Sequence, residues 1–157
     1  MTEYFSHNPV LLEEIIENLN LSNDGVYVDA TLGMGGYTEK ILNLSKCNLV
    51  SIDRDPYAIE KAKPLVERFG LRLKIVNGLF SNLEQILLDL NISKINGITF
   101  DFGVSSPQID TPERGFSFRF DSLLDMRMGG NEFSATDLLN KSEVSKIEKI
   151  LREYGEE

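Results

Sequence analysis

Residues 26–42 read VYVDATLGMGGYTEKIL, and this stretch decides the fold of the chain. Its first six residues alternate and are rich in β-branched side chains, which is typical of a strand. A helix is expected to follow from Gly36 to Leu44. Gly33, Gly35 and Gly36 lie between the two elements, and glycine lets a backbone turn tightly and a ligand approach the main chain. The stretch therefore predicts a strand, a ligand-binding turn and a helix whose first N–H groups face the ligand.

The same alternation of strand and helix continues up to Gly103. Apolar spacing and turn signals predict helices over residues 10–21, 36–44, 56–69 and 81–91, and strands over residues 26–31, 48–53, 71–77 and 95–103. Ser81 is expected as an N-cap. Short connections between alternating elements predict a parallel sheet covered by helices, which is an α/β fold. Four strands make about half of a usual doubly wound sheet, so one strand edge is expected to lack a partner.

The periodic pattern stops after Gly103. Residues 104–130 have no clear period and are rich in Ser, Pro, Arg, Phe and Asp. Two helical patterns close the chain, over residues 134–140 and 142–155, and Ser134 and Ser142 are expected as their N-caps.

The bulk properties exclude several classes of protein. The chain has 157 residues, a net charge of −9 and one cysteine, Cys47, which excludes an internal disulfide and a cysteine-built metal site. No apolar run approaches the roughly 20 residues of a membrane span, and the N-terminus lacks the features of a secretory signal. A cytoplasmic protein with no membrane partner is expected. The negative net charge lowers the expectation of a nucleic-acid partner, because phosphate contacts need Lys and Arg.

The residues around the glycines indicate which ligand they serve. Asp53 ends the second predicted strand, 20 residues after Gly33, where an acid binds ribose hydroxyls in nucleotide-binding folds. Position 38 is Thr38 and not the glycine or alanine of a dinucleotide motif, and Asp29 precedes the loop. This pattern favours a ligand without pyrophosphate, such as S-adenosylmethionine. An NAD(P) enzyme is the alternative, and so is a turn that uses glycine for geometry alone, with Asp53 a solvated acid.

Two further residues follow predicted strands at the same edge of the sheet. Phe80 comes after the third strand, where its ring can lie against adenine or pack in the core. Asp101 ends the fourth strand. A carboxylate after a buried apolar strand is hard to explain by packing, because burying an unpaired charge costs free energy. Capping the following turn is its alternative role.

Five motifs give the chain a close resemblance to a known family. They are HNPVLL at 7–12, DATLGMGG at 29–36, DFGVSSPQID at 101–110, ERGFSF at 113–118 and LDMRM at 124–128. Together they resemble the bacterial ribosomal RNA small subunit methyltransferase H family over essentially the whole chain. The resemblance implies a Rossmann-like class I methyltransferase fold that uses S-adenosylmethionine. It also implies methylation of the exocyclic N4 of a cytosine in the decoding region of 16S rRNA, with the small ribosomal subunit as partner.

The resemblance also implies a domain division. Family members run to about twice this length, so the chain resembles an N-terminal part. Residues 1–108 would form a partial Rossmann-like domain, and residues 109–157 would begin an inserted helical substrate domain. The remaining strands of the sheet would come after that insertion.

The family's cofactor positions carry over one by one. The positions that match the pattern are Gly35, Gly36, Asp53, Phe80, Asp101 and Gln108. Tyr37 stands where the pattern usually has His, which keeps a backbone contact and loses an imidazole contact. Leu123 stands where the pattern has Pro, which affects a turn more than the cofactor site. Asp101 is also the candidate catalytic residue, because it can hold the amine that accepts the methyl group. Methylation at cytosine C5 would need a Cys nucleophile, and Cys47 lies far from Asp101 in the sequence.

The substrate side of the chain leaves two interpretations open. Arg114, Arg119 and Arg127 interleave with phenylalanines in a pattern that can grip a base and its backbone. The interleaved rings are Phe116, Phe118 and Phe120. Alternatively, the rings plug the end of the sheet and the arginines pair with acids, for which the candidates are Glu113, Asp121 and Asp125. No metal is expected, and the single histidine, His7, is interpreted as structural or site-lining.

Two other functional classes remain as alternatives. One is a different Rossmann-like nucleotide-dependent enzyme, such as an NAD(P) oxidoreductase. The other is a truncated, non-catalytic remnant that binds the cofactor. A homodimer is kept as one candidate assembly.

Overall fold

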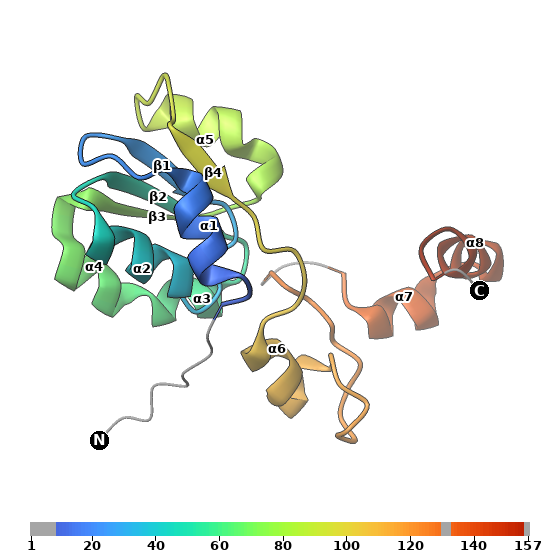
Figure 1. Cartoon of the computed structure of the whole chain (residues 1–157). Coiled ribbons are helices and arrows are strands. Elements are labelled where there is room, and N and C mark those ends of the chain that lie inside the picture. Colours follow the sequence, from blue (N-terminus) through green and yellow to red (C-terminus); the bar gives the residue numbers. More distant parts are fainter. Residues whose placement is uncertain (1–8, 130–132, 156–157) are drawn as a thin grey trace. The chain divides into compact units, whose positions relative to one another are not determined.

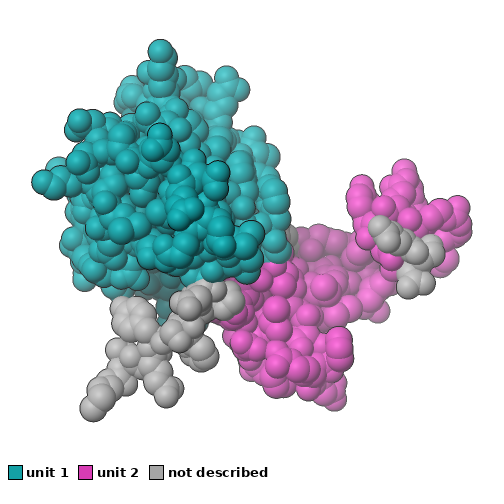
Figure 2. All heavy atoms as spheres, in the orientation of Figure 1, with its two compact units in different colours: residues 1–103 teal, residues 104–157 magenta. Residues whose placement is uncertain are grey.

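The computed structural model describes residues 9–129 and 133–155; His7 lies outside these residues. The chain divides into two compact units, residues 1–103 and 104–157 (Figures 1 and 2). Each unit is described by itself. The domain boundary that the resemblance places after Gln108 stays a prediction.

Unit 1 is built on a parallel sheet of four strands. They are β1 (Val26–Asp29), β2 (Asn48–Asp53), β3 (Leu73–Asn77) and β4 (Gly97–Thr99), in the order β3-β2-β1-β4. Val28 lies beside Val50 on one side and Ile98 on the other. The predicted parallel α/β fold is confirmed. Within the described residues β4 pairs with β1 alone and β3 with β2 alone, so both are edge strands, and one side of β4 lacks a partner as expected.

Helices cover both faces of this sheet (Figure 1). They are α1 (Leu12–Leu19), α2 (Gly36–Leu44), α3 (Pro56–Lys61), α4 (Lys63–Phe69) and α5 (Leu83–Asp89). Tyr27 and Leu49 point to one face, where side chains of α1, α2 and α4 pack on them. Val28 and Val50 point to the other face, which α5 covers. Because strands buried on both faces need apolar residues at successive positions, β1 begins with Val26, Tyr27 and Val28 and β2 contains Leu49, Val50 and Ile52. Asp29 and Asp53 mark the carboxyl ends of the two strands.

The predicted helix over residues 56–69 is wrong as a single element. It is split at Ala62 into α3 and α4. Pro64 explains the break, because in a continuous helix its ring would clash with the carbonyl of Glu60 and it has no N–H to donate. In the first turn of α4 that missing N–H costs nothing.

Several other element boundaries differ from the prediction. Residues 70–72 form the 3-10 turn η1, so β3 begins only at Leu73. Ser81 is not an N-cap: it lies inside the 3-10 turn η2 (Phe80–Asn82), and α5 begins at Leu83. Strand β4 covers only residues 97–99 of the predicted 95–103.

Unit 2 consists of short helices joined by irregular chain. They are α6 (Ser106–Asp110), the 3-10 turn η3 (Pro112–Arg114), α7 (Ala135–Lys141) and α8 (Val144–Tyr154). Ser134 caps α7 as predicted, since its hydroxyl accepts from the N–H of Asp137 at 3.0 Å. Ser142 does not cap α8: it ends α7, and Glu143 precedes α8.

Candidate functional site

The three glycines are explained first by the protein's own packing. Gly33 and Gly35 have left-handed φ angles of +50° and +81°, where other residues are strained. A Cβ atom at Gly35 would also lie 2.5 Å from Leu65 Cδ1, and one at Gly36 would overlap the ring of Pro9. Turn geometry at Gly33 and Gly35 and close packing at Gly35 and Gly36 therefore account for the three glycines, and the case for a ligand depends on the groups around them.

Asp53 lies directly beside the glycine loop. Its Oδ2 accepts from the N–H of Gly33 at 2.8 Å, and its Oδ1 accepts from the N–H of Asp55 at 2.9 Å. The residue is half-buried. Each carboxylate oxygen has two acceptor positions, so Asp53 can bind hydroxyls of a ligand while it holds the end of β2 to the loop.

A buried polar network lies beneath the loop. Asp29 is fully buried, and its Oδ2 accepts from the hydroxyl of Thr38 at 2.7 Å. The N–H of Thr31 donates to Oδ1 at 3.3 Å, and the Thr38 hydroxyl also lies 2.7 Å from Ser51 Oγ. The network ties β1, α2 and β2 together at the carboxyl end of the sheet. It also shows what Thr38 does in place of the small residue of a dinucleotide motif.

Burial raises the pKa of Asp29 from its ordinary value of 3.8 to about 6. The hydrogen bond from Thr38 opposes this rise, and the charges of Asp53 and Asp101 add to it. Asp29 was recognised in the sequence only as an acid ahead of the loop. The hydrogen bonds that Thr38 makes with Asp29 and Ser51 could not be predicted from the sequence. The one unusual feature there was Thr38 itself, which departs from the dinucleotide pattern.

Asp101 shares the electrostatic environment of the loop. Its N–H donates to Thr31 Oγ1 at 2.7 Å, which ties the segment after β4 to the segment after β1. Its charge raises the pKa of both Asp29 and Tyr37. The structure thus brings Asp29, Asp53 and Asp101 together at one edge of unit 1, and this edge suits a ligand that carries positive charge.

Phe80 lies in a half-exposed cluster of aromatic side chains. Its ring centroid is 5.8 Å from that of Phe100, in an edge-on arrangement, and 5.6 Å from that of Phe102. Phe80 is 43 % exposed, so it is not a core residue of the described chain. Sequence reasoning missed Phe100 and Phe102 as its neighbours, although both flank Asp101 and alternation along an extended chain puts them on one side.

Tyr37 does not offer its side chain to a ligand. The residue is buried, its ring belongs to the core on the α1 side of the sheet, and its hydroxyl donates to the carbonyl of Val10. Burial raises the pKa of Tyr37 above its ordinary value, and Asp101 and Asp29 raise it further. A contact between Tyr37 and the cofactor through its backbone N–H stays a prediction.

Gln108 belongs to unit 2 and is buried there. Its Oε1 accepts from the N–H of Ser105 at 2.9 Å, and the two residues form a capping box at the start of α6. This gives Gln108 a structural role. A contact with the cofactor stays a prediction.

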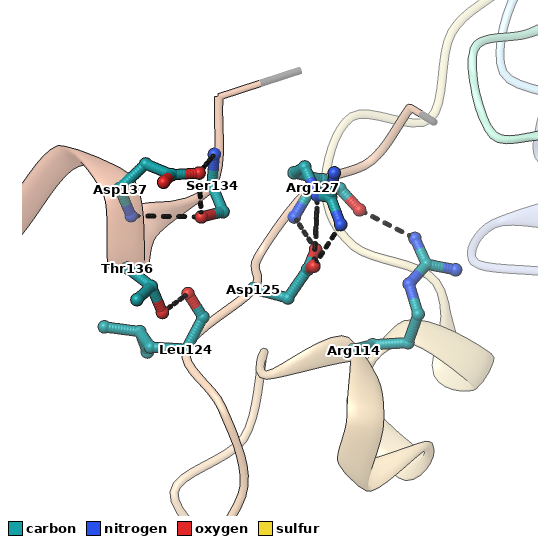
Figure 3. Close-up of polar contacts among 7 residues, drawn as sticks. All are labelled: Arg114, Leu124, Asp125, Arg127, Ser134, Thr136 and Asp137. Carbon is teal, nitrogen blue, oxygen red and sulfur yellow. Dashed lines mark hydrogen bonds and ion pairs between the residues drawn. The ribbon is translucent and has the colours of Figure 1, made fainter. Parts of the chain in front are cut away.

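Arg114 and Arg127 of unit 2 are held by an acid and by the backbone (Figure 3). Arg127 forms a fork with Asp125, with Nε 3.0 Å from Oδ1 and a guanidinium NH2 group 2.6 Å from Oδ2. Arg114 donates to the carbonyl of Arg127 at 2.9 Å. Arg119 pairs with Asp110 at 2.7 Å. The pairing interpretation is confirmed for Arg127, whereas the partner of Arg119 was not among the predicted acids.

The phenylalanines of this segment lie close to the same arginines. Arg114 lies over the ring of Phe116 at 5.9 Å, and Arg119 lies over that of Phe120 at 5.6 Å. Phe118 is fully exposed. Such arginine–ring pairs present flat cationic surfaces. The segment therefore keeps features suited to binding a nucleobase, although Arg119 and Arg127 also form ion pairs.

In the described part of the chain, no group of three or more His, Cys, Asp or Glu side chains is arranged to hold a metal ion. Among the same residues, no helix is long and apolar enough to cross a membrane.

The parallel sheet, the glycine loop and the carboxylates at the strand ends define a Rossmann-like α/β protein. The model of the MraW methylase family matches residues 4–157, and the chain belongs to this family. The resemblance drawn from the motifs is thereby confirmed.

Individual relatives agree with this membership. The chain is 49 % identical over 156 residues to the ribosomal RNA small subunit methyltransferase H of Caldicellulosiruptor saccharolyticus, with 98 % of the chain and 50 % of the relative covered. It is 46 % identical over 151 residues to the protein of that name from Zymomonas mobilis, covering 96 % and 46 %. The chain therefore spans about half the length of these curated relatives.

One solved structure that matches part of the chain is that of an rRNA methylase from Streptococcus thermophilus. The match has a TM-score of 0.48 and 22 % identity, and it covers 63 % of this chain and 57 % of the other. At that score the likeness adds no weight to the function.

Proposed function

We propose that the chain supplies the S-adenosylmethionine-binding half of a methyltransferase that modifies N4 of a cytosine in the decoding region of 16S rRNA. Membership in the MraW methylase family supports the reaction class. The observation that carries the cofactor is the convergence of Asp29, Asp53 and Asp101 beside the glycine loop. S-adenosylmethionine has a positive sulfonium and no phosphate, so it suits this edge. A pyrophosphate would be repelled by three carboxylates, which argues against an NAD(P) enzyme.

Most of the predicted cofactor residues have a role in this proposal. Asp53 accepts hydrogen bonds from the ribose hydroxyls, and the ring of Phe80 lies against adenine. The first N–H groups of α2, at Gly36 and Tyr37, face the carboxylate of the methionine part. Gly35 sets the left-handed turn that aims these N–H groups outward.

The chemistry needs alignment more than acid–base assistance. Bound S-adenosylmethionine supplies a methyl group that is already activated by its sulfonium. The protein has to hold the acceptor nitrogen in line with the methyl group and the sulfur, and positioning of this kind supplies a large part of a rate enhancement. Asp101 follows β4 and is exposed, and it would accept a hydrogen bond from the exocyclic amine and hold that amine toward the methyl group. The nitrogen would gain the methyl group as the methyl–sulfur bond breaks and would lose one proton.

The proposed substrate follows from the chain's relatives. The curated relatives are named for the small-subunit ribosomal RNA, so the proposed partner is 16S rRNA in the small subunit, and the proposed location is the cytoplasm. The Arg and Phe side chains of residues 114–127 form the start of the substrate domain, which begins after Gln108.

Methyl transfer to isolated small ribosomal subunits tests this function. Subunits that lack the modification are incubated with the chain and methyl-labelled S-adenosylmethionine, and nucleosides from digested 16S rRNA are separated. Label in N4-methylcytidine is expected, and Asp101→Asn should lower the yield. Asp24→Asn alters an exposed acid ahead of β1, so it serves as the control. Label in another nucleoside would contradict the proposed target.

A second candidate is a chain that binds the cofactor without transferring the methyl group. The chain covers 50 % and 46 % of the two relatives named above, so binding and transfer are tested separately. Saturable binding of S-adenosylmethionine with no transfer to small subunits would select this candidate.

A further inference from the structure

The segment ahead of α1 is fastened to the glycine loop by two neighbouring contacts. The ring of Pro9 lies on the Cα atom of Gly36, where a Cβ atom would overlap it. The hydroxyl of Tyr37 donates to the carbonyl of Val10. Two consecutive residues of the segment thus contact two consecutive residues at the start of α2.

The hydroxyl of Tyr37 is well suited to this contact. Its phenol extends from the start of α2 to the carbonyl of Val10, which it reaches with its terminal oxygen. Burial and the nearby carboxylates Asp101 and Asp29 raise the pKa of Tyr37. The hydroxyl therefore keeps its proton and remains a donor at neutral pH.

The backbone beyond the contact is strained. Leu11 has a φ of +52°, which residues other than glycine rarely adopt, and its side chain is 62 % exposed. Its exposed side chain contributes little packing to offset this strain. The contacts of Pro9 and Val10 with the loop supply a compensating interaction. An exposed ion pair one turn along, Lys40 with Glu13 at 2.7 Å, joins α2 to α1 but does not touch the loop.

We propose that Tyr37 is a positioning residue of the cofactor site: its hydroxyl holds Pro9 and Val10 against the glycine loop, so that they form part of the wall around the ligand. The proposal rests on the function proposed above, because it takes S-adenosylmethionine as the ligand. A ligand that lies along the main chain of Gly36 meets Pro9. Release of the segment therefore opens one side of the site and speeds dissociation of the ligand.

The test is the dissociation rate of S-adenosylmethionine from the full chain, measured by stopped-flow fluorescence competition. Tyr37→Phe removes only the hydroxyl and should speed dissociation by about three- to tenfold, the usual worth of one hydrogen bond. Tyr37→His should act in the same way. Lys40→Gln breaks the neighbouring exposed pair and should leave the rate within about twofold of the wild type.

A double-mutant cycle separates positioning from a general loss of packing. Pro9→Ala removes the ring that contacts Gly36. If Tyr37 acts through this segment, Tyr37→Phe has a smaller effect on dissociation in the Pro9→Ala background than alone. Equal effects in both backgrounds would overturn the proposal, and so would an unchanged rate in Tyr37→Phe. A wild-type chain that binds no S-adenosylmethionine would contradict the proposed function as well, whereas normal binding with unchanged rates would overturn the positioning role alone.

Discussion

Unit 1 and unit 2 are each stabilised internally by a different kind of interaction. In unit 1, buried side chains of β1 and β2 pack against helices on both faces of the sheet. In the described residues of unit 2, only Gln108 and Gly115 are buried, and hydrogen bonds, ion pairs and helix caps hold its segments. Apolar burial is the main favourable term in folding. Unit 1 therefore supplies most of the free energy of unfolding, and it also contains the carboxylates of the proposed cofactor site.

The largest expected effect comes from a matched pair of leucines, one in each unit. Leu49 is 1 % exposed in β2, and Leu151 is 52 % exposed in α8. Leu49→Ala should lower the free energy of unfolding by about 2–5 kcal/mol, while Leu151→Ala should change it by less than about 0.5 kcal/mol. Urea denaturation followed by circular dichroism measures both. Similar losses for the two variants would break the comparison.

The next effect concerns Asp29 and pH. Its pKa is about 6 in the folded chain and 3.8 ordinarily, so the folded chain binds more protons than the unfolded chain between these values. This contribution favours folding at low pH and is lost as the pH rises through about 6. Relative to Asp29→Asn, the wild type should lose up to about 3 kcal/mol between about pH 3 and pH 7.

Urea denaturation across this pH range measures the difference between the two proteins. Thr38→Val removes a hydrogen bond that lowers the pKa of Asp29, so it should steepen the pH dependence. A difference between wild type and Asp29→Asn that stays constant with pH would show that Asp29 does not titrate in this range.

A smaller effect tests whether unit 1 holds the ribose. Asp53→Ala should weaken S-adenosylmethionine binding by about 1–3 kcal/mol, because ribose hydroxyls would lose an acceptor. Asp24→Ala, at the opposite end of β1, should leave the affinity unchanged. Calorimetric titration gives both affinities, and an unaltered affinity in Asp53→Ala would refute the placement of the ribose.

The smallest effect sharpens the description of unit 2. Asp125→Asn weakens the fork with Arg127, and the Arg127 guanidinium lowers the pKa of Asp125. Amide hydrogen exchange should speed up in residues 124–129 and 133–136, where hydrogen bonds join Leu124 and Asp125 to Ala135 and Thr136. The strands of unit 1 should exchange as before. Faster exchange in β1 or β2 would mean that the two units are not independent in stability.

The sequence predicted the parts of the fold that depend on local pattern. Helix α2 and strand β2 have the predicted bounds, because a glycine turn and a buried apolar run define their ends. The split at Ala62 was missed because a periodic apolar pattern hides the effect of Pro64 on the preceding turn. Ser81 and Ser142 resemble caps in the sequence, but a cap depends on backbone angles that the neighbouring 3-10 turn and helix α7 already fix.

The candidate site was predictable where it depends on strand ends. The carboxyl ends of parallel strands meet at one edge, so Asp53 and Asp101 could be grouped before any coordinates were known. The direction of the Tyr37 side chain could not, since it depends on contacts 27 residues away in the sequence. The network of Asp29, Thr38 and Ser51 likewise joins two strands and a helix, and no local pattern reveals it.

The most direct measurement is a calorimetric titration of the 157-residue chain with S-adenosylmethionine, beside a parallel titration with NAD⁺. The acidic edge of unit 1 predicts saturable binding of S-adenosylmethionine and no binding of NAD⁺. Binding of NAD⁺ alone, or no binding of S-adenosylmethionine by a chain that melts cooperatively, would contradict the assignment of the glycine loop and its carboxylates as the cofactor site.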